Sequence, residues 1–199
     1  MMRPITQGGT RGHLSDEDRE TYNRLRKQEI LLDVDAHRLN LADGVILVAC
    51  SDGDQLPDIF SNISHSFAGQ RSSPRIHTIA LNGGALLLPE DSPLVTAHRE
   101  DEVLLEHIKV ARELKNIHTV ALYTHAPCGA GTLAGLTLEE ELNLLLSAKV
   151  RIKEHLPGIK TACFCHIDRG ESKRTYFVSR NKWILQHMYP DEPNLWVTG

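Results

Sequence analysis

The chain alternates between continuous apolar runs and segments in which apolar residues recur at helical spacing. Short apolar runs rich in β-branched residues are typical of strands that a parallel sheet buries on both faces. Four segments have this character, at 45–50, 76–81, 119–124 and 161–167. A fifth strand is predicted at 175–179, because the turn-like sequence Asp168-Arg169-Gly170 lets it form a hairpin with the fourth.

Three segments have the spacing of amphipathic helices. The first runs from Asp16 to about Asp35 and places along one side Tyr22, Leu25, Glu29 and Leu32. The second, at 102–115, places on one face Leu104, Ile108, Ala111 and Leu114. The third, at 137–150, begins with a Thr137–Glu140 capping box and directs inward Leu138, Leu142, Leu145 and Leu146. The polar segment 59–73 is interpreted as a loop or a short irregular helix.

Helices that alternate with strands imply right-handed crossovers and a parallel sheet. We therefore predict an α/β fold of three layers, with helices flanking a mostly parallel four-stranded sheet that has one added antiparallel edge strand. The length favours a single domain over 1–199, with an N-terminal helical arm at 1–40, an α/β core at 42–180 and a C-terminal tail at 181–199. In that tail, Trp183-Ile184-Leu185 forms either a partner contact or a short core helix.

The composition narrows the class of protein. Lys and Arg number 22 against 26 Asp and Glu, so the formal charge is −4, which argues against non-specific binding of nucleic acid. No apolar stretch approaches the roughly 20 residues of a membrane span. The polar, Gly-rich start of the chain lacks the layout of a signal peptide, so we expect a cytoplasmic protein that binds neither membrane nor nucleic acid.

Two of the predicted strands end in residues that bind metal ions. One ends in Cys50-Ser51-Asp52 and the other leads into His125-Ala126-Pro127-Cys128. Ligands of open α/β sheets bind beyond the carboxyl ends of strands, so Cys50, His125 and Cys128 converge if the two strands are neighbours. Two thiolates and one imidazole suit tetrahedral Zn²⁺ with one position left for another ligand. Taken alone, a cysteine at a strand end such as Cys50 is usually a small buried apolar residue, and a lone His-x-x-Cys is a weak signal of metal binding.

The remaining two cysteines, Cys163 and Cys165, alternate along the fourth predicted strand and face the same side, whereas His166 faces the other. No third ligand lies beside them in the sequence, so we interpret them as core residues.

The motifs resemble those of the β-class carbonic anhydrases, in which Cys-x-Asp-x-Arg is followed by a later His-x-x-Cys. Here Cys50-Ser51-Asp52 is followed by His125-x-x-Cys128-Gly129, and the resemblance extends over roughly 42–180, including Asn82-Gly83-Gly84-Ala85 and the segment 111–120. It implies zinc bound by Cys50, His125 and Cys128, and the reversible hydration of carbon dioxide to bicarbonate. It also implies a homodimer or higher homo-oligomer, in which the N-terminal helix and the C-terminal tail contact the partner.

The chain departs from the family pattern beside the site. Where the family has Arg two residues after Asp, this chain has Asp54, and Leu81 replaces the usual Arg before Asn82. In the family that Arg pairs with the Asp and keeps it off the zinc. Two neighbouring carboxylates repel each other, and Asp54 offers no donor while it is ionised. Arg71 or Arg75 could fold back as a substitute.

Three hypotheses follow for the function, and whether the chain is an enzyme stays open among them. The first is a zinc lyase that hydrates carbon dioxide, with Asp52 as the catalytic residue that orients the nucleophile. The second is a zinc hydrolase or lyase acting on another small electrophile, which the altered Asp52-Gly53-Asp54 sequence and the longer segment after Cys50 motivate. The third is a catalytically silent homologue in which Asp52 closes the site as a fourth zinc ligand.

Overall fold

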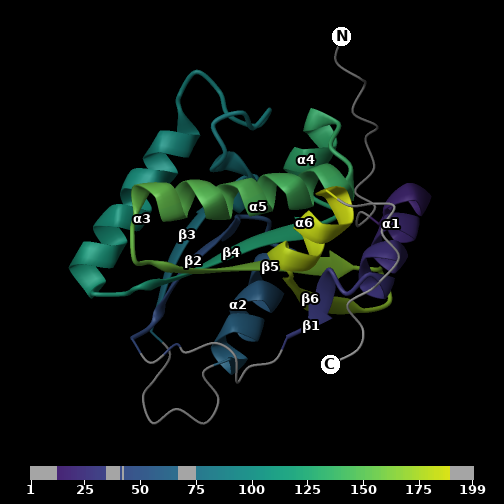
Figure 1. Cartoon of the computed structure of the whole chain (residues 1–199), viewed down its shortest axis with the longest axis horizontal. Coiled ribbons are helices and arrows are strands. Elements are labelled where there is room, and N and C mark those ends of the chain that lie inside the picture. Colours follow the sequence, from purple (N-terminus) through teal and green to yellow (C-terminus); the bar gives the residue numbers. More distant parts are fainter. Residues whose placement is uncertain (1–12, 35–40, 42, 67–74, 189–199) are drawn as a thin grey trace.

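The computed structural model describes residues 13–34, 41, 43–66 and 75–188. Its centre is a six-stranded sheet in the order β1-β6-β5-β4-β2-β3 (Figure 1). Four of the strands are parallel and were predicted from the apolar runs: β2 (Val45–Cys50), β3 (Ile76–Leu81), β4 (Thr119–Ala126) and β5 (Lys160–Asp168). The fifth, β6 (Lys173–Val178), forms the predicted antiparallel hairpin with β5. The α/β fold class is confirmed.

The sheet contains one strand more than predicted. β1 (Leu31–Asp33) pairs antiparallel with β6, so β6 lies inside the sheet and β1 forms its edge. The prediction of a helix continuing to about Asp35 is therefore wrong, since α1 (Asp16–Lys27) ends earlier. The reason is local: Glu29 adopts a φ of 56° and the Ile30 amide bonds back to the Leu25 carbonyl, which closes the helix and releases the chain as a strand.

Six further helical elements follow α1 in the described part of the chain. They are α2 (Leu56–His65), the 3₁₀ helix η2 (Gly84–Leu87), α3 (Glu100–Lys115), α4 (Gly129–Ala134), α5 (Leu138–His155) and α6 (Arg180–Met188). The first half of the segment 59–73 is thus a regular helix, and residues 67–74 lie outside the described part of the chain. Trp183 is buried on α6, in agreement with the core-helix interpretation. The rest of the C-terminal tail, at 189–199 and including the Trp196 expected to contact a partner, lies outside the described residues.

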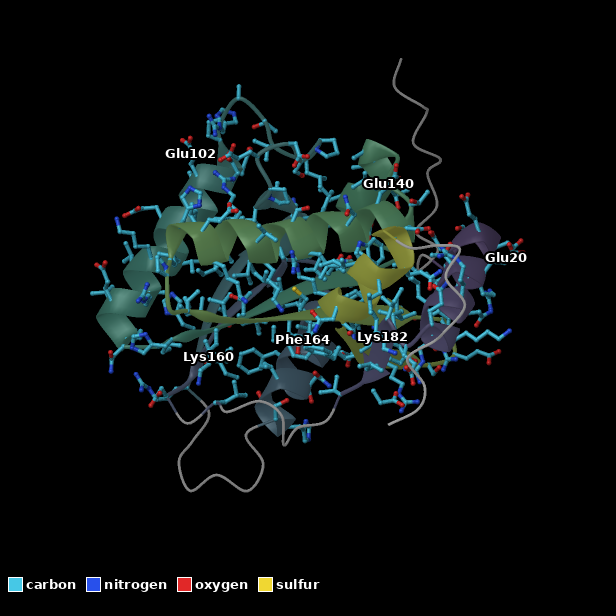
Figure 2. All side chains as sticks on the ribbon, viewed as in Figure 1. Glu20, Glu102, Glu140, Lys160, Phe164 and Lys182 are labelled. Atoms are coloured by element: carbon cyan, nitrogen blue, oxygen red, sulfur yellow. The ribbon has the colours of Figure 1, made fainter. Side chains whose placement is uncertain are left out.

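Two apolar cores lie on the two faces of the sheet. The larger one packs residues of α1, α3, α5 and α6 against one face, and the smaller one packs Ile59 and Ile63 of α2 against the other. In the smaller core Phe164, labelled in Figure 2, stacks on Tyr123. The two ring centroids are 4.7 Å apart. The three predicted layers are therefore present. None of the helices in the described part of the chain is long and apolar enough to cross a membrane.

The predicted inward faces of α3 and α5 are confirmed with one exception, whereas Glu29 and Leu32, predicted along one side of the first helix, lie beyond the end of α1. All four leucines predicted to point inward from α5 are buried, and its Thr137–Glu140 capping box is present. On α3, however, Leu114 is 73% exposed. Successive helical residues are about 100° apart, so Leu114 has turned well away from the buried stripe of Leu104, Ile108 and Ala111.

A buried ion pair joins the two long helices. Asp101 of α3 is fully buried and accepts a hydrogen bond of 2.8 Å from Arg151 of α5. Arg151 also donates to the Leu88 carbonyl, directly after η2. The hydrogen bonds from Arg99 and Arg151 hold the pKa of Asp101 well below its usual range. The pair thereby fixes the segment between β3 and α3 against the helical layer.

Candidate metal centre

The three predicted ligands come from the ends of two neighbouring strands and from the turn that follows. Cys50 is the last residue of β2, His125 lies near the end of β4, and Cys128 directly precedes α4. Because β2 and β4 are parallel neighbours, their carboxyl ends meet at the same edge of the sheet. The structure brings the two Sγ atoms and one imidazole nitrogen within 4.8 Å of one another, and all three residues are buried.

The ligands approach this edge from both faces of the sheet. Side chains alternate along a strand, so Cys50 belongs to the face of Ile46 and Val48, which lies under α5. His125 belongs to the face of Ala121 and Tyr123, which lies over α2. The candidate site therefore sits where the two faces of the sheet come together.

His125 fits the role of a metal ligand. It is 1% exposed, and neither of its ring nitrogens has a hydrogen-bond partner among the described residues. A buried polar atom without a partner costs free energy, and a bond to a metal removes that cost. An imidazole nitrogen between two sulfur atoms is a donor set that favours zinc. The residues present therefore fit the ion that the sequence predicts.

The two cysteines differ in their affinity for protons. The Cys128 thiol, the His125 ring and the Gly83 amide all lower the pKa of Cys50, to about 4, against the opposing effect of burial. The amide of Gly83 lies 3.3 Å from Cys50 Sγ, in a turn where Gly83 adopts a φ of 88°. The interaction with Cys50 and burial raise the pKa of Cys128. One thiolate and one thiol therefore share the proton that a metal ion would displace.

Asp52 lies beside the candidate ligands. Its Oδ2 is 4.0 Å from His125 Nε2, and its side chain is one-third exposed. Its Oδ1 accepts a 2.8 Å hydrogen bond from the amide of Asp54, which directs the other oxygen toward the site. The predicted catalytic residue is thus placed within reach of a group held by the three ligands.

Of the two arginines predicted as substitutes, Arg75 does not reach the site. Arg75 precedes β3, so it lies at the opposite end of the sheet, where it donates to the carbonyls of Asp43 and Lys115. Its proposed role as a substitute is therefore wrong. Arg71 lies outside the described residues.

Residues near Asp52 that the sequence did not single out come from the β5–β6 hairpin. Lys173 Nζ donates to the Asp54 carbonyl oxygen at 2.6 Å, and Gln55 Nε2 donates to Asp168 Oδ2 at 3.0 Å. Both contacts span more than a hundred residues of sequence, so no local pattern could have indicated them.

Glu141 is the second feature that the sequence did not reveal. It stands in the first turn of α5, where acidic residues are common, yet it is only 4% exposed. Its Oε2 lies 3.4 Å from the Thr124 hydroxyl, one residue before His125. Burial raises the pKa of Glu141 well above its ordinary value.

Cys163 and Cys165 lie in the larger core, and burial raises the pKa of both thiols. This agrees with their interpretation as core residues. His166 points to the other face, where its Nδ1 lies 2.9 Å from the Thr175 hydroxyl.

No family model and no curated protein matches the sequence. Among solved structures, a mutant of the β-carbonic anhydrase CafD from Aspergillus fumigatus is 10% identical, with a TM-score of 0.43, over 75% of this chain and 99% of that one. The β-carbonic anhydrase isoform I from Trichomonas vaginalis is 12% identical, with a TM-score of 0.41, over 83% of this chain and 99% of that one. At these identities the comparisons do not assign the metal site, so its assignment depends on the geometry of Cys50, His125 and Cys128 in this chain.

Proposed function

We propose that the chain is a zinc-dependent carbonic-anhydrase-like enzyme that hydrates carbon dioxide reversibly to bicarbonate. The observation that carries this proposal is the convergence of Cys50, His125 and Cys128, with both nitrogens of the buried His125 unpartnered. The sequence motifs support it, because the same three residues stand in the pattern of the β-class enzymes.

In this proposal Cys50, His125 and Cys128 hold the ion. Zinc, when bound, supplies the Lewis acidity that ionises water near neutral pH. Attack of hydroxide on carbon dioxide forms one C–O bond and yields bicarbonate, and the proton lost from water passes to solvent or buffer. Two thiolates offset the charge of zinc, and the Gly83 amide draws electron density from Cys50, so its 3.3 Å contact preserves part of the acidity.

Asp52 has the role of orienting the nucleophile. A carboxylate only accepts hydrogen bonds while it is ionised, so Oδ2 aligns a hydroxyl group that faces it. The hydrogen bond from the Asp54 amide to Oδ1 keeps Oδ2 directed at the site. Partial exposure of Asp52 leaves a path by which the released proton reaches solvent.

A closed, catalytically silent zinc site is the second candidate. One observation favours it: among the described residues, no arginine donates a hydrogen bond to the Asp52 carboxylate. Without such a partner, Asp52 is free to become the fourth ligand. Action on a different small electrophile remains a prediction that no contact in the site favours over hydration of carbon dioxide.

A stopped-flow assay of carbon dioxide hydration between about pH 7 and pH 9, on protein with quantified zinc, tests the proposal. We expect one zinc per chain, turnover that rises with pH, and loss of both zinc and turnover in Cys128→Ser. Cys163→Ser is the matched control, because Cys163 is buried in the core with its thiol toward the Leu145 carbonyl, and it should keep both. A full complement of zinc without turnover would contradict the proposal and favour the Asp52-closed site.

The assembly state and the compartment are further proposals. We propose a homodimer or higher homo-oligomer, as the sequence resemblance implies, together with a cytoplasmic location and a single domain whose zinc-binding core spans 42–180, as the N-terminal sequence and the chain length suggest. Light scattering coupled to size-exclusion chromatography tests the first of these, and a monomeric mass at micromolar concentration would contradict it.

A further inference from the structure

The turn that carries Asp52 is held from outside by a group of four side chains. We call Gln55, Asp58, Asp168 and Lys173 the turn clamp. Lys173 Nζ donates to the Asp54 carbonyl at 2.6 Å and lies 3.1 Å from Asp58 Oδ2 and 3.7 Å from Asp168 Oδ2. Asp168 in turn accepts a hydrogen bond from Gln55 at 3.0 Å. The turn between β2 and α2 is thus attached at two points to the β5–β6 hairpin.

Three of the four clamp residues are largely covered, whereas Asp58 is about half exposed. Asp168 and Gln55 are both buried, and the hydrogen bonds from Gln55 and the Gly170 amide, together with Lys173, keep the pKa of Asp168 low despite that burial. Lys173 has about two-thirds of its side-chain surface covered. The three groups around its ammonium, the Asp54 carbonyl and the carboxylates of Asp58 and Asp168, are all hydrogen-bond acceptors. They therefore hold the ammonium group at one position beside the turn.

A direct chain of contacts leads from Lys173 to the candidate metal centre. The carbonyl of Asp54 is held by Lys173, the amide of the same residue is held by Asp52 Oδ1, and Asp52 Oδ2 faces His125 at 4.0 Å. A shift of Asp54 therefore rotates the Asp52 carboxylate. No other lysine or arginine of the described residues makes a hydrogen bond or ion pair to residues 52–55.

We propose that Lys173 is a positioning residue for Asp52: by anchoring Asp54, it sets the distance and orientation of the Asp52 carboxylate relative to the metal centre. This inference rests on the proposed zinc site and deepens its mechanism. Lys173 touches neither the ion nor the substrate, and its effect passes entirely through Asp52.

The test compares four variants: Lys173→Met, Lys173→Arg, Asp52→Asn, and the double variant that combines Lys173→Met with Asp52→Asn. Lys182→Met is the matched control, since Lys182 pairs with Glu29 beyond the other end of β6. The first readout is the visible spectrum of the protein loaded with Co²⁺ in place of zinc, followed over pH, which reports the surroundings of the ion whether or not the protein turns over. The second is kcat for carbon dioxide hydration.

We expect Lys173→Met to shift the pH at which the cobalt spectrum changes and to lower kcat about 10- to 100-fold, with KM little changed, as displacement of an orienting group does. Lys173→Arg should restore most of both, and Lys182→Met should resemble the wild type. When Asp52 is already replaced by Asn, the Lys173→Met change should have no further effect on the spectrum or on kcat. Lys173 acts only through the Asp52 carboxylate, so the effects of the two changes are not additive.

Two results would overturn the inference: a wild-type cobalt spectrum and kcat in Lys173→Met, or additive effects of the two changes. If Lys173→Met does not fold, Gln55→Leu removes the second attachment of the turn and is read in the same way. If the wild-type protein shows no turnover, the proposed activity is refuted but the inference about Lys173 is not. The cobalt spectra of the single and double variants still decide whether Lys173 acts through Asp52.

Discussion

A β-carbon placed on Gly131 would lie 2.0 Å from Oε1 of Glu141. The buried carboxyl of α5 therefore rests directly against the backbone of α4, one turn after Cys128. Glycine permits this close approach, since a β-carbon at Gly131 would displace the end of the buried Glu141 side chain. The contact fixes where the turn that carries Cys128 stands relative to β4.

Replacement of Gly131 by Ala should destabilise the protein by about 1–3 kcal/mol, because the added methyl group displaces Glu141 or α4. The zinc affinity should fall as well, since Cys128 moves with α4. Urea unfolding and chelator competition measure the two effects. Gly129→Ala is the matched control: its β-carbon meets nothing within 4 Å, so the change should be neutral or slightly stabilising in the helix. Equal losses in both variants would contradict the packing argument.

The buried carboxyl of Glu141 should make stability depend on pH in a definite direction. In the unfolded chain this group ionises near its ordinary value of 4.5, whereas in the folded chain burial raises its pKa and it keeps its proton. Above pH 4.5 the folded state therefore binds more protons than the unfolded state, and the stability contributed by this group falls as pH rises. Glu141→Gln cannot ionise, so its unfolding free energy relative to wild type should increase between pH 5 and pH 8.

Urea unfolding at matched zinc occupancy measures that difference at each pH. Glu140→Gln serves as the control, since Glu140 is an exposed neighbour whose pKa is lowered by its hydrogen bonds to Thr137. Its variant should lose stability relative to wild type as pH rises above about 4, because the ionised carboxylate is the form that caps the helix. A pH-independent offset for Glu141→Gln would show that Glu141 is ionised in the folded protein.

The ion pair between Arg151 and Asp101 should matter far more than a surface pair of similar chemistry. Arg151→Met leaves the fully buried carboxylate of Asp101 with Arg99 as its remaining partner, and loss of one member of a buried pair costs about 3–5 kcal/mol. Arg24→Met removes the exposed pair with Glu139 and should cost less than about 1 kcal/mol.

The loss of unfolding free energy in Arg151→Met, relative to wild type, should also become smaller as the pH falls below 4. The low pKa of Asp101 in the wild type stabilises the ionised form, and this contribution is lost in acid. Thermal unfolding of both variants against wild type measures the costs. Comparable losses of stability for Arg151→Met and Arg24→Met would show that the buried ion pair contributes no more to stability than the exposed one.

The parts of this molecule that could be predicted are those in which the information is local. The run from Val45 to Cys50 is β2 residue for residue, and the cysteine at its end could be assigned to the metal-binding edge because parallel strands share that edge. β1 was missed because three residues carry no periodicity, and its pairing with β6 depends on where α1 stops.

The missing parts of the site depend on contacts between residues distant in sequence. Lys173 and Asp54 are 119 residues apart, and neither has a sequence context that indicates the other. Glu141 has the appearance of an ordinary acidic residue at a helix start, and only the packing of α5 on Gly131 shows that it is buried. A lysine or a glutamate becomes part of a site through its surroundings, which the tertiary fold supplies.

The origin of the ligands on opposite faces of the sheet has a mechanical consequence. Cys50 lies on the face of the sheet that α5 covers, whereas His125 lies on the face that α2 covers. An ion bound by these residues cross-links the ends of β2 and β4 with the turn before α4, so these segments cannot separate without breaking a bond to the ion. Because the ion binds only the folded arrangement, loading the site should make local opening at this edge of the sheet rarer on both of its faces.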